Sequence, residues 1–126
     1  MTQQEFENHL LNGELIYIGL SNHYVKLDEN AEIISCYEEK WKLKNINFSV
    51  CKLVKDIPEI AYLAAILETL FNGKEITNGV NTISYNLKLQ LLYLDDVCLS
   101  IERYNVFYFI DDRFEDTLHP KFYPKI

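Results

Sequence analysis

The sequence predicts an α+β protein built on an antiparallel sheet, and three observations support this class. Short runs of alternating apolar and polar residues recur from position 14 onward. One long segment near the middle instead repeats its apolar residues with a helical period. Turn signals between the short runs favour hairpins over parallel crossovers. We therefore expect a twisted antiparallel sheet of six to eight strands, with one main helix at about 58–72 packed on one face and a short N-terminal helix at about 2–12.

The short N-terminal helix has both a start and a stop signal. Thr2 followed three residues later by Glu5 matches a capping box. Phe6 and Leu10 share one helical face, and Gly13 suits the left-handed residue that ends a helix. These local signals predict an amphipathic helix that buries one side.

Strands are expected next, at 15–20 and 23–27, followed by a third strand from about 32 to 43. The apolar positions then change from odd to even numbers at Lys44-Asn45. A slip of one residue would send apolar side chains to the solvent face, so this change predicts a turn or bulge before a new strand.

The clearest element is the main helix at 58–72. Pro58 suits the first helical position, and Asn72-Gly73 suits the end. The apolar residues form one continuous stripe, and the opposite side is also poor in charge. Such a helix is either covered by a second layer or part of a contact surface. Both alternatives stay open: cover by the N-terminal helix or an extended segment, or a homodimer through helix 58–72.

Hairpin signals follow the main helix. Asn78-Gly79 predicts a type I′ turn, and the stretch 84–94 alternates as one strand. Asp95-Asp96 predicts the turn into a strand at 97–104, after which another apolar stretch at 106–110 is expected to be extended.

Length and composition fit one globular domain. A chain of 126 residues, of which 48% are hydrophobic and 25% charged, can bury a single core. We expect one domain over 1–126, with 111–126 as a surface-wrapping tail. No apolar stretch reaches the roughly 20 residues of a membrane span, and no secretory signal is evident. We therefore expect a cytoplasmic protein with no membrane association, and the scarcity of Ala, Gly, Pro and Arg fits a low-GC bacterium or its phage.

Charge is distributed unevenly along the chain. Nineteen acids against twelve bases give a net charge of −7, which disfavours general nucleic-acid binding. Residues 40–55 nevertheless hold five lysines and no acid. An acidic protein with one basic segment is therefore expected.

Motifs that would indicate catalysis or a metal site are missing from the sequence. Cys36, Cys51 and Cys98 have no CxxC spacing, and we expect all three to be buried thiols in a reducing compartment. The three histidines have no ligand spacing, and no glycine-rich phosphate loop occurs. We predict no catalytic residue, metal or cofactor, although a small enzyme with a Cys-His or carboxylate site stays open as an alternative.

The C-terminal region combines carboxylates with aromatic rings. Such acids can meet the Lys/Arg surface with which a nucleic-acid-handling protein holds phosphates, and aromatic residues often anchor interfaces. The sequence therefore predicts a small acidic non-enzymatic protein that inhibits a larger basic partner, such as a nuclease, a CRISPR effector or a toxin, by occluding its cleft. Phage anti-CRISPR proteins and toxin-immunity proteins work in this way. The predicted contact residues are Asp111, Asp112, Glu115, Asp116, Tyr108, Phe114 and Tyr123.

A second hypothesis is a protein, monomeric or dimeric, that binds a small anionic ligand such as a nucleotide. Three lysines alternate with Trp41 and Leu43, so one strand would present all three on the same face. Lysines on an exposed edge strand also prevent pairing with other chains, and the sequence does not choose between these roles. The predicted ligand residues are Lys40, Trp41, Lys42 and Lys44.

Overall fold

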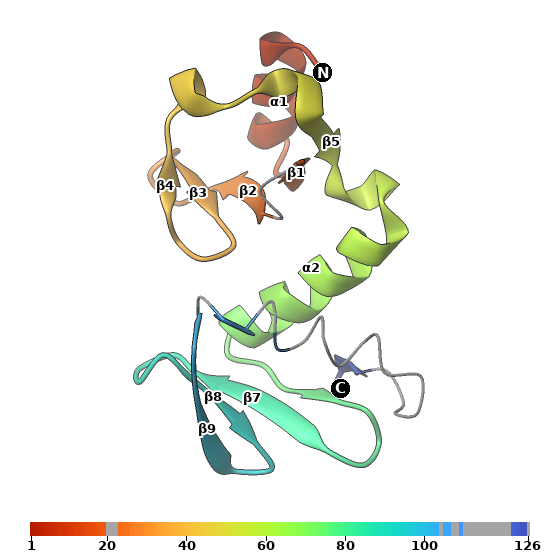
Figure 1. Cartoon of the computed structure of the whole chain (residues 1–126), viewed down its shortest axis with the longest axis vertical. Coiled ribbons are helices and arrows are strands. Elements are labelled where there is room, and N and C mark those ends of the chain that lie inside the picture. The colour runs from red at the N-terminus through yellow and green to blue at the C-terminus, as the bar shows by residue number, and fades with distance from the viewer. Residues whose placement is uncertain (20–22, 104, 107–108, 110–121, 126) are drawn as a thin grey trace. The chain divides into compact units, whose positions relative to one another are not determined.

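The computed structural model describes residues 1–19, 23–103, 105–106, 109 and 122–125 (Figure 1). The chain divides into two compact units, Met1–Ala61 and Tyr62–Ile126, which we call the first and second units. Within the described residues, ten strands form two antiparallel sheets of five, accompanied by helices α1 and α2. The α+β class is confirmed, but the strands are distributed over two sheets instead of one. The single-domain expectation for 1–126 stays a prediction.

Helix α1 (Gln3–Leu11) begins and ends as predicted. The Oγ1 atom of Thr2 accepts a hydrogen bond from the Glu5 N–H, and the Glu5 carboxylate accepts one from the Thr2 N–H. At the other end Gly13 has a φ of 78°, and the N–H groups of Gly13 and Glu14 donate to carbonyls of the last turn. This pattern is a Schellman motif, which satisfies carbonyls that the helix leaves unpaired.

The first sheet has the strand order β4-β3-β2-β1-β5, and all neighbouring strands are antiparallel. Its strands are β1 (Ile16–Ile18), β2 (His23–Leu27), β3 (Ile33–Ser35), β4 (Lys40–Trp41) and β5 (Cys51–Leu53). A 3₁₀ helix at Leu43–Asn45 forms the turn expected from the change of phase. The chain then forms a second 3₁₀ helix, Phe48–Val50, before β5 begins, so the new strand starts later than predicted.

The predicted strand at 32–43 is wrong, because the chain forms the hairpin β3–β4 there. Ser35 is 1% exposed, and its Oγ accepts hydrogen bonds from the N–H groups of Tyr37 and Glu39. Glu38, between them, has a φ of 66°. One buried hydroxyl therefore helps to reverse the chain inside the run that was predicted as a single strand.

Helix α1 packs on the first sheet around Phe6. Phe6 and Leu10 share a buried cluster with Ile16 and Val25 of the sheet. The Phe6 ring meets the Phe48 ring edge-on, with centroids 5.1 Å apart. This cluster is the core of the first unit.

A charged group joins the end of α1 to the segment that precedes α2. The Glu14 carboxylate contacts Nδ1 of His9 and accepts a hydrogen bond from Lys55 Nζ at 2.9 Å. The Lys55 ammonium and the His9 ring hold the pKa of the Glu14 carboxyl below its ordinary value of 4.5.

Glu14→Gln is expected to reduce the acid sensitivity of folding. Because the Glu14 carboxyl has a lower pKa in the folded chain than in the unfolded chain, its stabilising contribution is present above the unfolded-state pKa and is lost as the pH falls through the folded-state pKa. Thermal unfolding at pH values from about 6 down to about 3 should therefore show a smaller loss of Tm for Glu14→Gln than for the parent protein. Glu59→Gln, at an exposed position of α2, is the control. An equal acid-induced loss in the Glu14→Gln and parent proteins would contradict this prediction.

Helix α2 (Pro58–Phe71) belongs to the second unit from Tyr62 onward. It begins at the predicted proline and ends before Gly73, which has a φ of 80°. Figure 1 shows this part of α2 lying across the second sheet, and the Phe71 ring meets Tyr85 of that sheet edge-on at 5.1 Å. The main helix therefore packs on a sheet face as predicted. Its buried residues are Leu63, Ala64, Ile66, Leu67 and Leu70.

The second sheet has the strand order β10-β6-β7-β8-β9 and is also antiparallel. Its strands are β6 (Ile76–Thr77), β7 (Thr82–Asn86), β8 (Leu91–Leu94), β9 (Val97–Glu102) and β10 (Tyr123–Pro124). β10 pairs with β6, which lies far from it in the sequence, so the sheet joins the end of the described chain to the segment after α2.

A second hairpin replaces the single strand predicted at 84–94. The Oδ1 atom of Asn86 accepts hydrogen bonds from two N–H groups of the following loop, and Gln90 has a φ of 57°. Leu87 and Leu89 stand at the tip of this β7–β8 hairpin, 52% and 56% exposed. The prediction failed because Asn86 occupies a polar position of the alternating pattern, which is compatible with a strand. Its side chain instead closes a turn.

The two predicted turns both occur, one of them with a different type. Asn78 begins a loop over 78–81 in which its Oδ1 accepts hydrogen bonds from the N–H groups of Val80 and Asn81. The predicted type I′ turn at 78–79 is therefore wrong in type, since only Gly79 of this pair has a positive φ. Asp95 and Asp96 instead have φ values of 48° and 68°, as a two-residue hairpin loop of type I′ requires.

The segment after β9 is helical where the sequence predicts an extended stretch. Its described residues Arg103, Asn105, Val106 and Phe109 all have helical backbone, so they do not form the expected strand. Among the residues that the structure describes, no helix is long and apolar enough to cross a membrane.

The cysteines differ from one another in exposure. Cys36 and Cys51 are buried as expected, but Cys98 is exposed on β9. Burial raises the pKa of the Cys51 thiol, which keeps it protonated near neutral pH. Cys51 therefore acts as a small apolar residue in the first core.

Candidate binding sites

Of the predicted partner-contacting residues, the structure describes Tyr123. It lies on β10 opposite Thr77 of β6, and its side chain is 51% exposed. Its hydroxyl lies 3.9 Å from the position that a Cβ on Gly79 would occupy. Tyr123 is thus an exposed aromatic residue beside the 78–81 loop. The other predicted contact residues lie outside the described residues: Asp111, Asp112, Glu115, Asp116, Tyr108 and Phe114.

The second sheet has one face directed away from α2, which we call the outer face. Ile83 and Tyr85 of β7 are buried, whereas Thr82 and Ser84 alternate with them and are half-buried. Side chains directly opposite in paired strands share a face, so Tyr123 joins Thr82 through its register with β6. The outer face therefore carries hydroxyl-bearing side chains.

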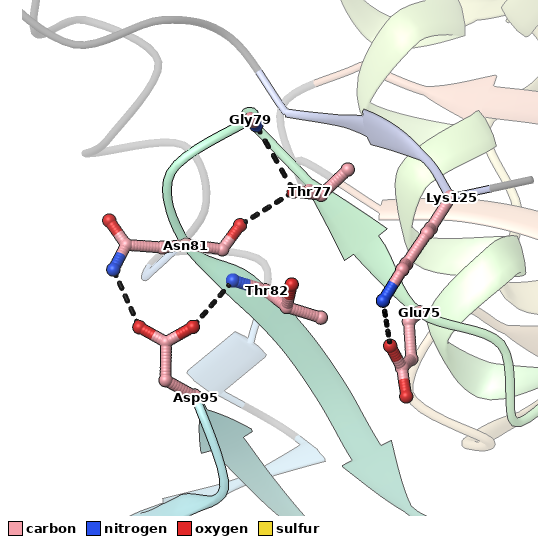
Figure 2. A network of polar contacts seen from close by, with 7 residues as sticks. All are labelled: Glu75, Thr77, Gly79, Asn81, Thr82, Asp95 and Lys125. Carbon is pink, nitrogen blue, oxygen red and sulfur yellow. Dashed lines mark hydrogen bonds and ion pairs between the residues drawn. The ribbon is translucent and has the colours of Figure 1, made fainter.

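A hollow of ≈ 300 Å³ lies on this face, and we call it the acidic hollow. Figure 2 shows part of its wall, where Lys125 Nζ lies 3.3 Å from a Glu75 carboxylate oxygen. This contact partly neutralises Glu75, while Asp96 has no ion-pair partner among the described residues. The hollow is lined by Glu75, Thr82, Ser84, Asp95, Asp96 and Lys125.

Asp95 holds the loops at this end of the sheet together. Its carboxylate accepts a hydrogen bond from Asn81 Nδ2 at 2.6 Å and from the Thr82 N–H at 2.8 Å (Figure 2). These hydrogen bonds hold the pKa of the Asp95 carboxyl below its ordinary value. The bond from the Thr82 N–H lowers it most, and the bond from Asn81 lowers it further. Asp95 therefore has a structural role, as the turn interpretation of Asp95-Asp96 expected.

Exposed apolar side chains accompany these acids. We call residues 78–81, residues 95–97 and Tyr123 the loop end of the second sheet, because both connecting loops meet there. Val80 in the first loop is 78% exposed, and Val97 after the second is 63% exposed. The loop end therefore presents two valines and a tyrosine next to carboxylates.

The predicted ligand residues of the first unit line one shared hollow, which we call the lysine hollow. It has a volume of ≈ 490 Å³ and is open to solvent. Lys40 and Trp41 come from β4, an edge strand, and Lys44 comes from the 3₁₀ helix that follows. The three lysines therefore stand around a bend. The prediction that they share the face of one flat strand is wrong. The lining residues are Glu39, Lys40, Trp41, Lys42, Lys44 and Asn45.

Trp41 is fixed in the lysine hollow by packing behind it. It lies opposite Ile33 of β3 and packs against the first-unit core. Its ring also meets the His23 ring, with centroids 6.1 Å apart. Burial lowers the pKa of His23, although the Glu39 carboxylate opposes this, so the imidazole is neutral near pH 7. The support behind Trp41 is therefore aromatic and uncharged.

The lysines of this hollow differ in their partners. Lys40 Nζ lies 3.0 Å from the Glu32 carboxylate, which raises the pKa of Lys40. Lys42 and Lys44 are exposed and have no ion-pair partner among the described residues. Two ammonium groups are thus available to a ligand in a protein with a net charge of −7.

The second face of helix α2 meets the C-terminal segment. The Tyr62 hydroxyl donates a hydrogen bond to the carbonyl of Phe122, which is itself 5% exposed. This contact agrees with the alternative in which an extended segment covers that face. The homodimer through helix 58–72 stays a prediction.

The two hollows cannot be interpreted from a metal site among the described residues or from a similar protein. Within the described ranges, no group of three or more His, Cys, Asp or Glu side chains is arranged to hold a metal ion. No protein-family model, curated protein or solved structure matches the chain. The interpretation of both hollows therefore depends on their own geometry and charge.

Sequence reasoning missed the acidic hollow, and it grouped the residues of the lysine hollow without predicting that they surround a hollow. The lysine hollow is made by residues close together in the sequence, so a local pattern could identify it. Glu75, Asp96 and Lys125 come from three segments that meet only through the pairing of β10, β6, β7 and β8. The local sequence signal for the acidic hollow was the pair Asp95-Asp96, and this pair indicates a turn, not a binding surface.

Proposed function

We propose that this chain is a non-enzymatic binding protein that docks on a larger, basic partner and blocks the cleft in which that partner holds nucleic acid. The observation that carries the proposal is the loop end, where exposed Tyr123, Val80 and Val97 stand beside the carboxylates of Asp95 and Asp96. Protein interfaces combine aromatic and apolar anchors with complementary charge.

Net charge supports the same proposal. At −7 the chain is repelled by nucleic acid and attracted by a cleft of lysines and arginines. The acids at 111–116 precede Tyr123 in the sequence, so they extend the acidic character of this end of the chain. We place the protein in the cytoplasm of a bacterial cell, as a phage-encoded inhibitor of the anti-CRISPR type or as a toxin-immunity protein.

The experiment is capture of a partner on the immobilised chain, followed by measurement of association rates by surface plasmon resonance at low and high salt. The test variant replaces four acids by their amides, and we expect its association at low salt to be roughly tenfold slower or more, because electrostatic steering is lost. The four replaced acids are Asp111, Asp112, Glu115 and Asp116.

A matched control separates local charge from total charge. It replaces four acids of the first unit and changes the net charge by the same amount. Equal slowing in both variants, or a captured partner that still handles its nucleic acid when the chain is bound, would overturn the proposal. The four control acids are Glu7, Glu29, Asp56 and Glu59.

A further inference from the structure

We infer that the lysine hollow is a binding site for a nucleoside phosphate, with the base against Trp41 and the phosphates held by Lys42 and Lys44. This inference is independent of the proposed docking function, because it concerns the first unit and a ligand of the opposite charge.

The shape of the lysine hollow suits a small molecule. Its volume of ≈ 490 Å³ falls within the range of about 300–1,000 Å³ that ligand sites have. The 3₁₀ helix at Leu43–Asn45 produces the concave form, because it bends the chain directly after β4 and its Asn45 N–H donates back to the Lys42 carbonyl. A continued strand would present the lysines in a flat row instead.

The charges in the lysine hollow favour phosphate groups. Lys40 is engaged by Glu32, which leaves Lys42 and Lys44 with no ion-pair partner among the described residues. An ammonium group binds phosphate as a compact charge with three donors. Glu39 also lines the hollow and repels anions, which limits the number of phosphates that the site can hold.

Trp41 adds a preference for an aromatic base. Its half-buried indole is held from behind by Ile33 and the His23 ring, so stacking on its open side costs little additional ordering. Base–aromatic stacking contributes substantially to nucleic-acid binding and tolerates any base. A long nucleic acid is disfavoured by the net charge of −7, so we assign the site to a mononucleotide.

Trp41 also provides the measurement, because it is the only tryptophan in the chain. Titration of the whole protein with ATP is expected to change Trp41 fluorescence with a saturable dependence, and to raise the Tm. Tripolyphosphate and adenosine, tested separately, should each bind roughly tenfold more weakly than ATP, because each supplies half of the contacts.

Substitutions test the two halves of the site. Lys42→Ala with Lys44→Ala should weaken ATP binding roughly tenfold, whereas the matched control, Lys52→Ala with Lys74→Ala, should leave it unchanged. Trp41→Phe, followed by calorimetry because the fluorescence is lost, should keep part of the affinity, and Trp41→Ala should reduce ATP binding to the level of tripolyphosphate.

Several results would overturn the inference. One is the absence of any Tm or fluorescence change with ATP at millimolar concentration. Another is tighter binding of a single-stranded oligonucleotide than of ATP, which would indicate a nucleic-acid site. A third is unchanged ATP binding in the Lys42/Lys44 double variant together with increased aggregation, which would show that these lysines only protect the edge strand β4. The docking proposal is not affected by any of these results.

Discussion

Phe6→Ala is expected to lower the free energy of unfolding by about 3–5 kcal/mol, the largest effect that we expect from a single substitution. Phe6 is 0% exposed and belongs to the buried cluster in which α1 packs on the first sheet. Its removal leaves a cavity beside Phe48 and takes away the edge-on ring contact at 5.1 Å. The first unit has 61 residues, and a core of that size has little stability to lose.

Urea unfolding followed by Trp41 fluorescence measures this effect, because Trp41 packs against the same cluster. Leu11→Ala is the control: Leu11 lies on the same helix but is 74% exposed, so its loss should change the free energy of unfolding by no more than about 0.5 kcal/mol. If Phe6→Ala proves too unstable to fold, Phe6→Leu should still fold, with a smaller loss of about 1.5 kcal/mol. Equal stability of Phe6→Ala and Leu11→Ala would contradict the described core.

Leu67→Ala is expected to lower the free energy of unfolding of the second unit by about 2–5 kcal/mol. Leu67 is 0% exposed on α2, where it joins the buried stripe that faces the second sheet. The loss combines the transfer of an isobutyl group from the core and the cavity that remains.

The control for this prediction is the same change at an exposed leucine. Leu87 stands at the tip of the β7–β8 hairpin and is 52% exposed, so Leu87→Ala should alter stability by no more than about 0.5 kcal/mol. Far-UV circular dichroism during urea unfolding compares the two variants, because Trp41 reports on the first unit. A larger effect at Leu87 than at Leu67 would mean that the hairpin tip, and not the inner face of α2, is buried.

Elements with signals at both ends could be predicted from the sequence. Helix α1 has its capping box and Gly13, and α2 has Pro58 and Gly73, so each boundary depends on residues within a few positions. The β2 strand also has the predicted bounds, His23–Leu27. In these segments local chemistry and tertiary packing favour the same structure.

The two missed hairpins have a common physical cause. Ser35 and Asn86 are each a polar residue inside a predicted strand, and the side-chain oxygen of each accepts hydrogen bonds from N–H groups of the loop that follows. A serine or asparagine at such a position is compatible with a strand or a turn, and only the pairing of β3 with β4 and of β7 with β8 decides between them. Alternation alone could not locate these reversals.

The candidate sites could likewise be predicted only where their residues are close together in the sequence. Lys40, Trp41, Lys42 and Lys44 could be grouped from the sequence because they are near neighbours, but their arrangement around a bend depends on the 3₁₀ helix that begins at Leu43. The acidic hollow could not be predicted, since it requires β10 to pair with β6 across most of the second unit.

The exposure of Cys98, together with the burial of the other two thiols, allows the chain to be modified at a single chosen position. A maleimide dye would attach to β9 in the second unit, while the indole of Trp41 in the first unit serves as an energy-transfer donor. Resonance energy transfer between these two probes would measure the separation of the units in solution, and would record any change in it when a ligand or a partner is added.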